Sequence, residues 1–151
     1  MNQQCEEASL GKRPVVLFQP PNRVGLGHIN RLCAIALALR EIDPEVRVPF
    51  VVEGASHDLV EAHGLPHLDF PSRHELYKSG RWEAWGVEER SRLAVSIARA
   101  IIEKLQADLV VFDCFPCENL AAAAIECRIP MALCLRKGRN WDQYLDRKSV
   151  V

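Results

Sequence analysis

The residues best suited to chemistry lie in one turn, "PPNRVGLGHINR" from Pro20 to Arg31. Gly25 and Gly27 permit positive φ and let a ligand approach the backbone closely. A turn of this kind before a helix presents unpaired amides and the positive dipole end to an anion. His28 follows directly, where the dipole favours a neutral imidazole that can accept a proton. These residues predict an anion-binding site beside a general base. A purely structural role for His28, in shaping the turn, is equally consistent with them.

Two neighbouring positions bear on which anion is bound. Arg31 lies about one helical turn after His28 and could hold a carboxylate or a phosphate, or simply extend into solvent. Asn30 stands where a dinucleotide fingerprint has its third glycine, which serves close helix–strand packing. Glu53 ends a later apolar run and could bind a ribose hydroxyl. A dinucleotide such as NAD therefore stays an alternative, with Asn30 against it.

A second polar cluster, "FDCFPC", follows another apolar run. Asp113 is expected at the carboxyl end of a strand, facing the site or binding a nearby helix N-terminus. Cys114 and Cys117 have the C-x-x-C spacing of redox pairs and half zinc sites. No second pair supplies further ligands, and the histidines show no metal-binding spacing. We therefore expect reduced cysteines, no metal and no cofactor.

The elements that position these residues alternate between apolar runs and helical periods. Strands are expected at 14–19, 46–53, 65–71, 108–114 and 130–136. Helices are expected from His28 or Ile29 to about residue 43, and at 55–64, 87–107 and 117–129. In the third of these helices, one face carries Leu93, Ile97, Ala100, Ile101 and Leu105. A polar stretch with two tryptophans, Ser72–Gly86, is expected to be a loop or partly helical.

This alternation predicts an α/β fold with a Rossmann-like parallel sheet, in the order 3-2-1-4-5 with helices on both faces. Ligands bind such sheets at the carboxyl ends of the strands where the winding reverses. That rule brings three segments together: Pro20–His28, Glu53–Ser56 and Asp113–Asn119.

Composition bounds the remaining possibilities. The 151 residues fit one domain, and a net charge of −1 gives no argument for nucleic acid. No apolar run approaches the ~20 residues of a membrane helix. Residues 1–13 are expected to be a flexible leader without a secretory signal, which predicts a cytoplasmic protein. Trp82 and Trp85 could stack on a sugar or rest on lipid, which leaves peripheral membrane contact open.

Three segments carry a resemblance to a known family: "VGLGHINRLCAIALALRE", "ADLVVFDCFPCENL" and "IPMALCLRKGRNW". They resemble the amino-terminal, acceptor-binding domain of predicted GT-B glycosyltransferases, which carry a G-x-G-H-x-x-R turn. More distantly, the turn is similar to that of the peptidoglycan N-acetylglucosaminyltransferase and of the nucleotide-sugar hydrolase of pseudaminic acid synthesis. The resemblance runs from Pro14 to about Tyr144.

The resemblance implies that residues 14–151 are one half of a hexosyltransferase-type enzyme whose carboxyl-terminal donor domain is absent. Its partners would be a nucleotide-sugar donor, an unknown acceptor and a separate donor-binding domain or subunit. His28 would be the base, and Gly25 and Gly27 would bind the acceptor or the diphosphate, with Arg31 and Asp113 beside them. Truncated, split and stand-alone forms all fit, the last being a dinucleotide-binding or other small-molecule module without catalysis.

Overall fold

The computed structural model of the protein describes residues 13–21, 26–53, 57–70 and 85–135. The predicted leader up to residue 12, Gly25 and most of the tryptophan-containing loop lie outside these ranges. The elements alternate along the chain as follows: β1 (Val16–Gln19), α1 (Leu26–Ile42), β2 (Phe50–Glu53), α2 (His57–Ala62), β3 (His67–Phe70), α4 (Val87–Leu105), β4 (Leu109–Asp113), α5 (Glu118–Glu126) and β5 (Met131–Cys134). None of the helices described is both long and apolar enough to cross a bilayer.

The five strands form one parallel sheet in the order β3-β2-β1-β4-β5, which confirms the predicted topology. β1 is central and pairs with β4 along its whole length, from Val16 opposite Leu109 to Gln19 opposite Phe112. β2 begins at Phe50, whereas the apolar pattern predicted a strand from Val46. The reason is Pro49, which has no N–H for the ladder. Its carbonyl oxygen still accepts a hydrogen bond from the Phe18 amide at 2.9 Å.

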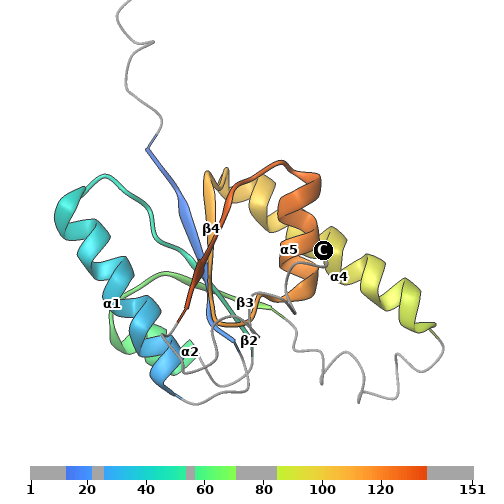
Figure 1. Ribbon diagram of the computed structural model, residues 1–151, viewed down its shortest axis with the longest axis horizontal. Helices are drawn as coiled ribbons and strands as arrows, with labels where there is room; N and C mark the ends of the chain where they lie inside the picture. The colour runs from blue at the N-terminus through green and yellow to red at the C-terminus, as the bar shows by residue number, and fades with distance from the viewer. Residues whose placement is uncertain (1–12, 22–25, 54–56, 71–84, 136–151) are drawn as a thin grey trace, which may run out of the picture.

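Helices cover both faces of the sheet, as predicted (Figure 1). Alternate residues of each strand point to opposite faces, so Leu17 and Phe112 pack with α4 and α5. Phe18 and Val111 pack with α1 and α2 on the other face. Strands buried on both faces explain why their sequences are continuously apolar.

The buried stripe of α4 differs from the predicted one. Ala94, Ala98 and Ile102 are the fully buried residues of this helix, while Ala100, which the prediction placed inward, is exposed. Ile97 and Ile101 pack only at the edge of the core. Small alanines at four-residue steps let the helix backbone approach its neighbours closely, which a hydrophobicity pattern alone does not reveal.

Helix α1 begins at Leu26, two residues before the predicted start. Gly27 therefore lies in the first turn of a helix and does not adopt the positive φ that its glycine would permit. Among the glycines in the described ranges, the positive φ belongs to Gly64, at 66°. Gly64 follows α2 and ends it, as its sequence context predicted.

Replacing Gly27 by alanine should stabilise the fold. A Cβ at this position meets no atom within 4 Å, and glycine loses more backbone freedom in a helix than alanine does. We expect the free energy of unfolding to rise by about 0.5–1 kcal/mol. Chemical denaturation measures this, with Gly64→Ala as the control, which should destabilise by about 1–2 kcal/mol because of its left-handed φ. Destabilisation by Gly27→Ala would contradict a helical first turn.

Candidate functional site

Three strand ends meet at the carboxyl edge of the sheet, where the site was predicted. Gln19 ends β1, Glu53 ends β2 and Asp113 ends β4. The Cys117 amide donates a hydrogen bond to Gln19 Oε1 at 3.3 Å, and the Cys117 sulfur lies 3.7 Å from Glu53 Oε1. His28, at the start of α1, contacts the Asp113 side chain. In the described residues, the predicted convergence of these segments is therefore confirmed.

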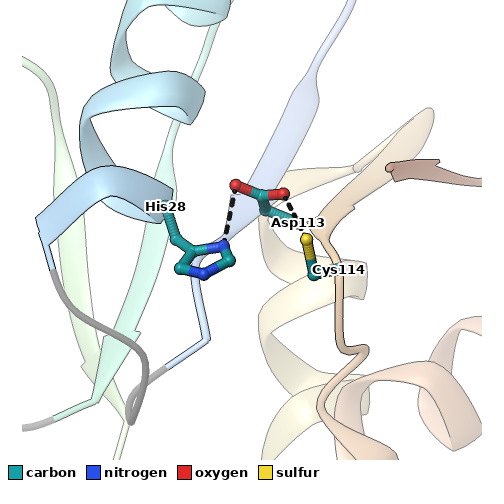
Figure 2. Close-up of side chains that lie close together, drawn as sticks. All are labelled: His28, Asp113 and Cys114. Atoms are coloured by element: carbon teal, nitrogen blue, oxygen red, sulfur yellow. Dashed lines mark hydrogen bonds and ion pairs between the residues drawn. The ribbon is translucent and has the colours of Figure 1, made fainter. Parts of the chain in front are cut away.

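Asp113 is the centre of this cluster and is fully buried. Arg31 Nη1 donates to Asp113 Oδ1 at 2.6 Å, and His28 Nδ1 lies 3.2 Å from Asp113 Oδ2. Figure 2 shows the imidazole turned toward the carboxylate, with its second nitrogen pointing away from it. His28 and Arg31 are three residues apart on α1, so they share one helix face and bind the same carboxyl group.

The two contacts of Asp113 differ in quality. The contact with Arg31 is a charge-assisted hydrogen bond at short distance. Burial by itself lowers the pKa of Arg31, but the Asp113 carboxylate and Cys114 together outweigh it, and the pKa is raised above its usual value. His28 Nδ1 and Asp113 Oδ2 are close, yet neither atom has an aligned hydrogen-bond partner within the described ranges.

Cys114 adds a sulfur to the same cluster. Its Sγ lies 3.3 Å from Asp113 Oδ1 and 3.9 Å from Arg31 Nη1. The residue has a φ of 61°, a left-handed conformation that costs a non-glycine residue on the order of 1–3 kcal/mol. A nitrogen of His28, an oxygen of Asp113 and the sulfur of Cys114 all lie within 4.8 Å of one another. These three atom types can together bind a divalent transition metal.

The structure thus joins three of the five predicted site residues, His28, Arg31 and Asp113, into one cluster. Gly27 is exposed in the first turn of α1, and Gly25 lies outside the described residues. The sequence pattern predicted Arg31 and Asp113 at the same site but not their pairing. Gln19 was not predicted as part of the site; it is buried, and its Nε2 donates to the Pro20 carbonyl at 2.7 Å. The available signal was a polar residue ending the apolar run "PVVLFQ".

The C-x-x-C pair does not have the arrangement of a redox motif. Cys114 contacts Asp113, whereas Cys117 lies against Glu53 in front of α5. Burial raises the pKa of the Cys117 thiol and is the largest effect; a hydrogen bond with the backbone of Leu120 opposes it, and the charge of Glu53 raises the pKa by less. A redox-active thiol at this position requires a lowered pKa. The cysteines in the described ranges are thiols rather than disulfides.

Alkylation of Cys117 should accordingly be slow at neutral pH. Because its pKa is raised, less of the thiol is ionised at pH 7–8 than in an ordinary cysteine, and thiolate is the reacting form. We expect the rate to rise only at a pH above that at which the same cysteine reacts in denaturant. Iodoacetamide labelling followed by mass spectrometry of the Cys117 peptide gives both profiles. If alkylation of Cys117 in the folded chain began at a lower pH than in denaturant, a raised pKa of this thiol would be contradicted.

Comparisons with known proteins give likeness in structure only. No protein-family model and no curated protein matches the sequence. MurG of Acinetobacter baumannii superposes with a TM-score of 0.61 at 17% identity, over 88% of this chain and 39% of its own. A UDP-N-acetylglucosamine 2-epimerase gives 0.57 at 16%, over 91% and 39%. The glycosyltransferase SnogD of Streptomyces nogalater gives 0.55 at 20%, over 90% and 38%.

These likenesses define the class of fold. The chain has the Rossmann-like α/β fold found in part of GT-B glycosyltransferases and of the epimerase. It spans less than two fifths of the length of each of these three proteins. At such low identity the comparisons establish the fold, and the activity is inferred from the site itself.

Proposed function

We propose that this chain is the acceptor-binding half of a glycosyltransferase that uses a nucleotide-diphosphate sugar. The observation that carries the proposal is the contact of His28 Nδ1 with the buried Asp113 carboxylate, 3.2 Å away at the carboxyl edge of the sheet. The resemblance of the glycine turn and the fold shared with glycosyltransferases support the same function.

His28 is the proposed base. With Nδ1 directed at Asp113, the second ring nitrogen, Nε2, points away from the carboxylate (Figure 2). An acceptor hydroxyl would give its proton to Nε2 while its oxygen forms a bond to the anomeric carbon. The bond between that carbon and the nucleoside diphosphate would break, and the diphosphate would leave as an anion. A positioned base of this kind contributes typically 10²–10⁴-fold to the rate.

Asp113 and Arg31 are proposed to position that base. A buried carboxylate facing Nδ1 selects the ring orientation and stabilises the imidazolium that forms on proton transfer. Arg31 binds the other carboxylate oxygen, so the carboxylate cannot rotate away from His28. Its side chain is 35% exposed, which leaves other guanidinium N–H groups available for an anionic acceptor or a diphosphate. Gly25 and Gly27 are proposed to keep the start of α1 accessible to that anion.

The donor is proposed to bind mainly to a second domain or subunit. The test supplies the nucleotide sugar to the purified chain with and without a donor-binding half, and measures release of UDP or GDP. We expect no release by the chain alone, because transfer requires both reactants to be held in near-attack geometry. Release should appear once the donor half is added. Robust turnover by the chain alone would refute the proposed division of roles.

A dinucleotide is the alternative ligand, and one observation favours it. Glu53 lies at the carboxyl end of β2, the position from which an acidic residue binds ribose hydroxyls in dinucleotide-binding folds. Calorimetric titrations with NAD⁺ and with UDP distinguish the two functions. Binding of NAD⁺ that is abolished by Glu53→Gln would favour the dinucleotide module over the transferase.

A further inference from the structure

We propose that His28, Asp113 and Cys114 form a binding site for a thiophilic divalent cation of the Zn²⁺ class. The sequence predicts no metal site, because the C-x-x-C pair lacks a second pair. The folded chain supplies different ligands, one from the start of α1 and two from the end of β4. The inference goes beyond the proposed transferase function, and the two states of His28 exclude each other: an imidazole that binds a metal through Nδ1 carries its proton on Nε2 and cannot act there as a base.

The main support for a metal site is a pair of buried polar atoms that face each other without an aligned hydrogen bond. His28 Nδ1 and Asp113 Oδ2 are 3.2 Å apart, and both lack a hydrogen-bond partner in the described residues. The side chain of Asp113 is fully buried and that of His28 is 15% exposed. Buried atoms of this kind cost free energy unless a further group pairs with them. A cation between them would satisfy both.

The distances suit a small tetrahedral ion. With metal–nitrogen, metal–oxygen and metal–sulfur bonds of about 2.0–2.3 Å, neighbouring ligand atoms lie about 3.3–3.6 Å apart. The histidine and aspartate atoms are at 3.2 Å, and all three ligand atoms lie within 4.8 Å. The sulfur would have to move closer to the other two ligand atoms for all three to bind a single ion. Three protein ligands leave a fourth coordination position for water or another ligand, as in catalytic zinc sites.

The neighbouring charges are compatible with this ion. Arg31 binds Asp113 Oδ1 and leaves Oδ2 available, so the guanidinium acts as an outer partner that orients the ligating carboxylate. On binding, the Cys114 thiol loses its proton to solvent as the sulfur–metal bond forms. Mg²⁺ and Ca²⁺ do not fit, because they require six or more oxygen ligands. The imidazole and thiolate ligands select zinc, cobalt or a similar ion.

The test is titration of the 151-residue chain with Co²⁺, a spectroscopic substitute for Zn²⁺. We expect one equivalent to bind with visible absorption of a tetrahedral site and a sulfur-to-cobalt charge-transfer band in the near ultraviolet. Zn²⁺ should displace the cobalt, and Mg²⁺ in excess should not. The absence of the charge-transfer band, or displacement by Mg²⁺, would overturn the proposal.

Variants assign the ligands. Cys114→Ser should abolish the charge-transfer band and weaken binding by at least about 100-fold, more than the ~10–100-fold loss typical of outer-shell changes. Cys114→Gly should do the same while keeping the fold, because glycine accepts the positive φ. Cys127→Ser and Cys134→Ser are the matched controls, and Cys134 lies directly opposite Asp113 in the sheet. A band that survives both Cys114 variants, or that is lost in Cys134→Ser, would overturn the assignment.

Discussion

Replacing His28 by alanine is expected to lower kcat by about 10²–10⁴-fold in an enzyme completed with a donor-binding half. The variant loses the group that accepts the hydroxyl proton, while the fold of the sheet is unaffected. The free energy of unfolding should change by no more than about 1 kcal/mol, the net value of one ordinary hydrogen bond. The reason is that His28 Nδ1 makes no aligned hydrogen bond in the described structure.

The measurement is steady-state kinetics beside the thermal midpoint of each variant. His63→Ala is the matched control, because His63 is exposed and lies in the turn after α2, at the opposite edge of the sheet from the site. It should keep full turnover. A His28→Ala enzyme with undiminished kcat would reduce the histidine to a turn-shaping role. A His28→Ala chain that unfolds would show that the residue is structural.

Changing Asp113 to asparagine is expected to have the second large effect. The amide keeps the size of the side chain and can still accept from Arg31, but it loses the charge that stabilises an imidazolium. An amide in place of the orienting aspartate of a serine-protease triad lowers kcat by about 10⁴-fold with the geometry intact. We expect a decrease of up to about that size, with little change in the thermal midpoint.

The Asp113→Ala variant measures what Asp113 contributes to the stability of the fold, apart from its effect on kcat. It removes the acceptor of the 2.6 Å hydrogen bond from Arg31 and should destabilise the chain by about 1–3 kcal/mol. Because Arg31 is partly exposed, its guanidinium can regain water, which favours the lower end of that range. Asp58→Asn is the matched control: Asp58 also faces a histidine, His57, at 3.0 Å, but it is 78% exposed. An Asp113→Asn enzyme with parental kcat would contradict the positioning role.

Much of the fold follows from local sequence. Runs such as "PVVLFQ" and "DLVVFD" are apolar at consecutive positions because both faces of each strand are covered, and their alternation with helical periods predicted the parallel sheet in the order that the structure has. Gly64 was correctly read as the end of α2, because a left-handed residue ends a helix with little strain only when it lacks a Cβ. These features depend on neighbours in the chain.

The differences between the predicted and the observed helices and strands have physical causes. β2 starts after Pro49 because the ladder needs N–H donors, and α4 turns its alanines inward because close packing outweighs side-chain hydrophobicity. Helix α1 extends back to Leu26, so Gly27 is helical. The inward alanines of α4 depend on what the packed sheet and α5 present, which a periodic pattern does not contain.

The sequence by itself determined the alternation of strands and helices, the edge of the sheet at which polar residues gather, and His28, Arg31 and Asp113 as candidates. Only the tertiary structure decided how these residues are paired. Arg31 and Asp113 are 82 positions apart, and they meet because β1 and β4 are neighbours and α1 packs beside them. The left-handed backbone at Cys114 likewise brings a sulfur to the same carboxylate. Contacts of this range depend on chain packing in three dimensions, and local propensity does not encode them.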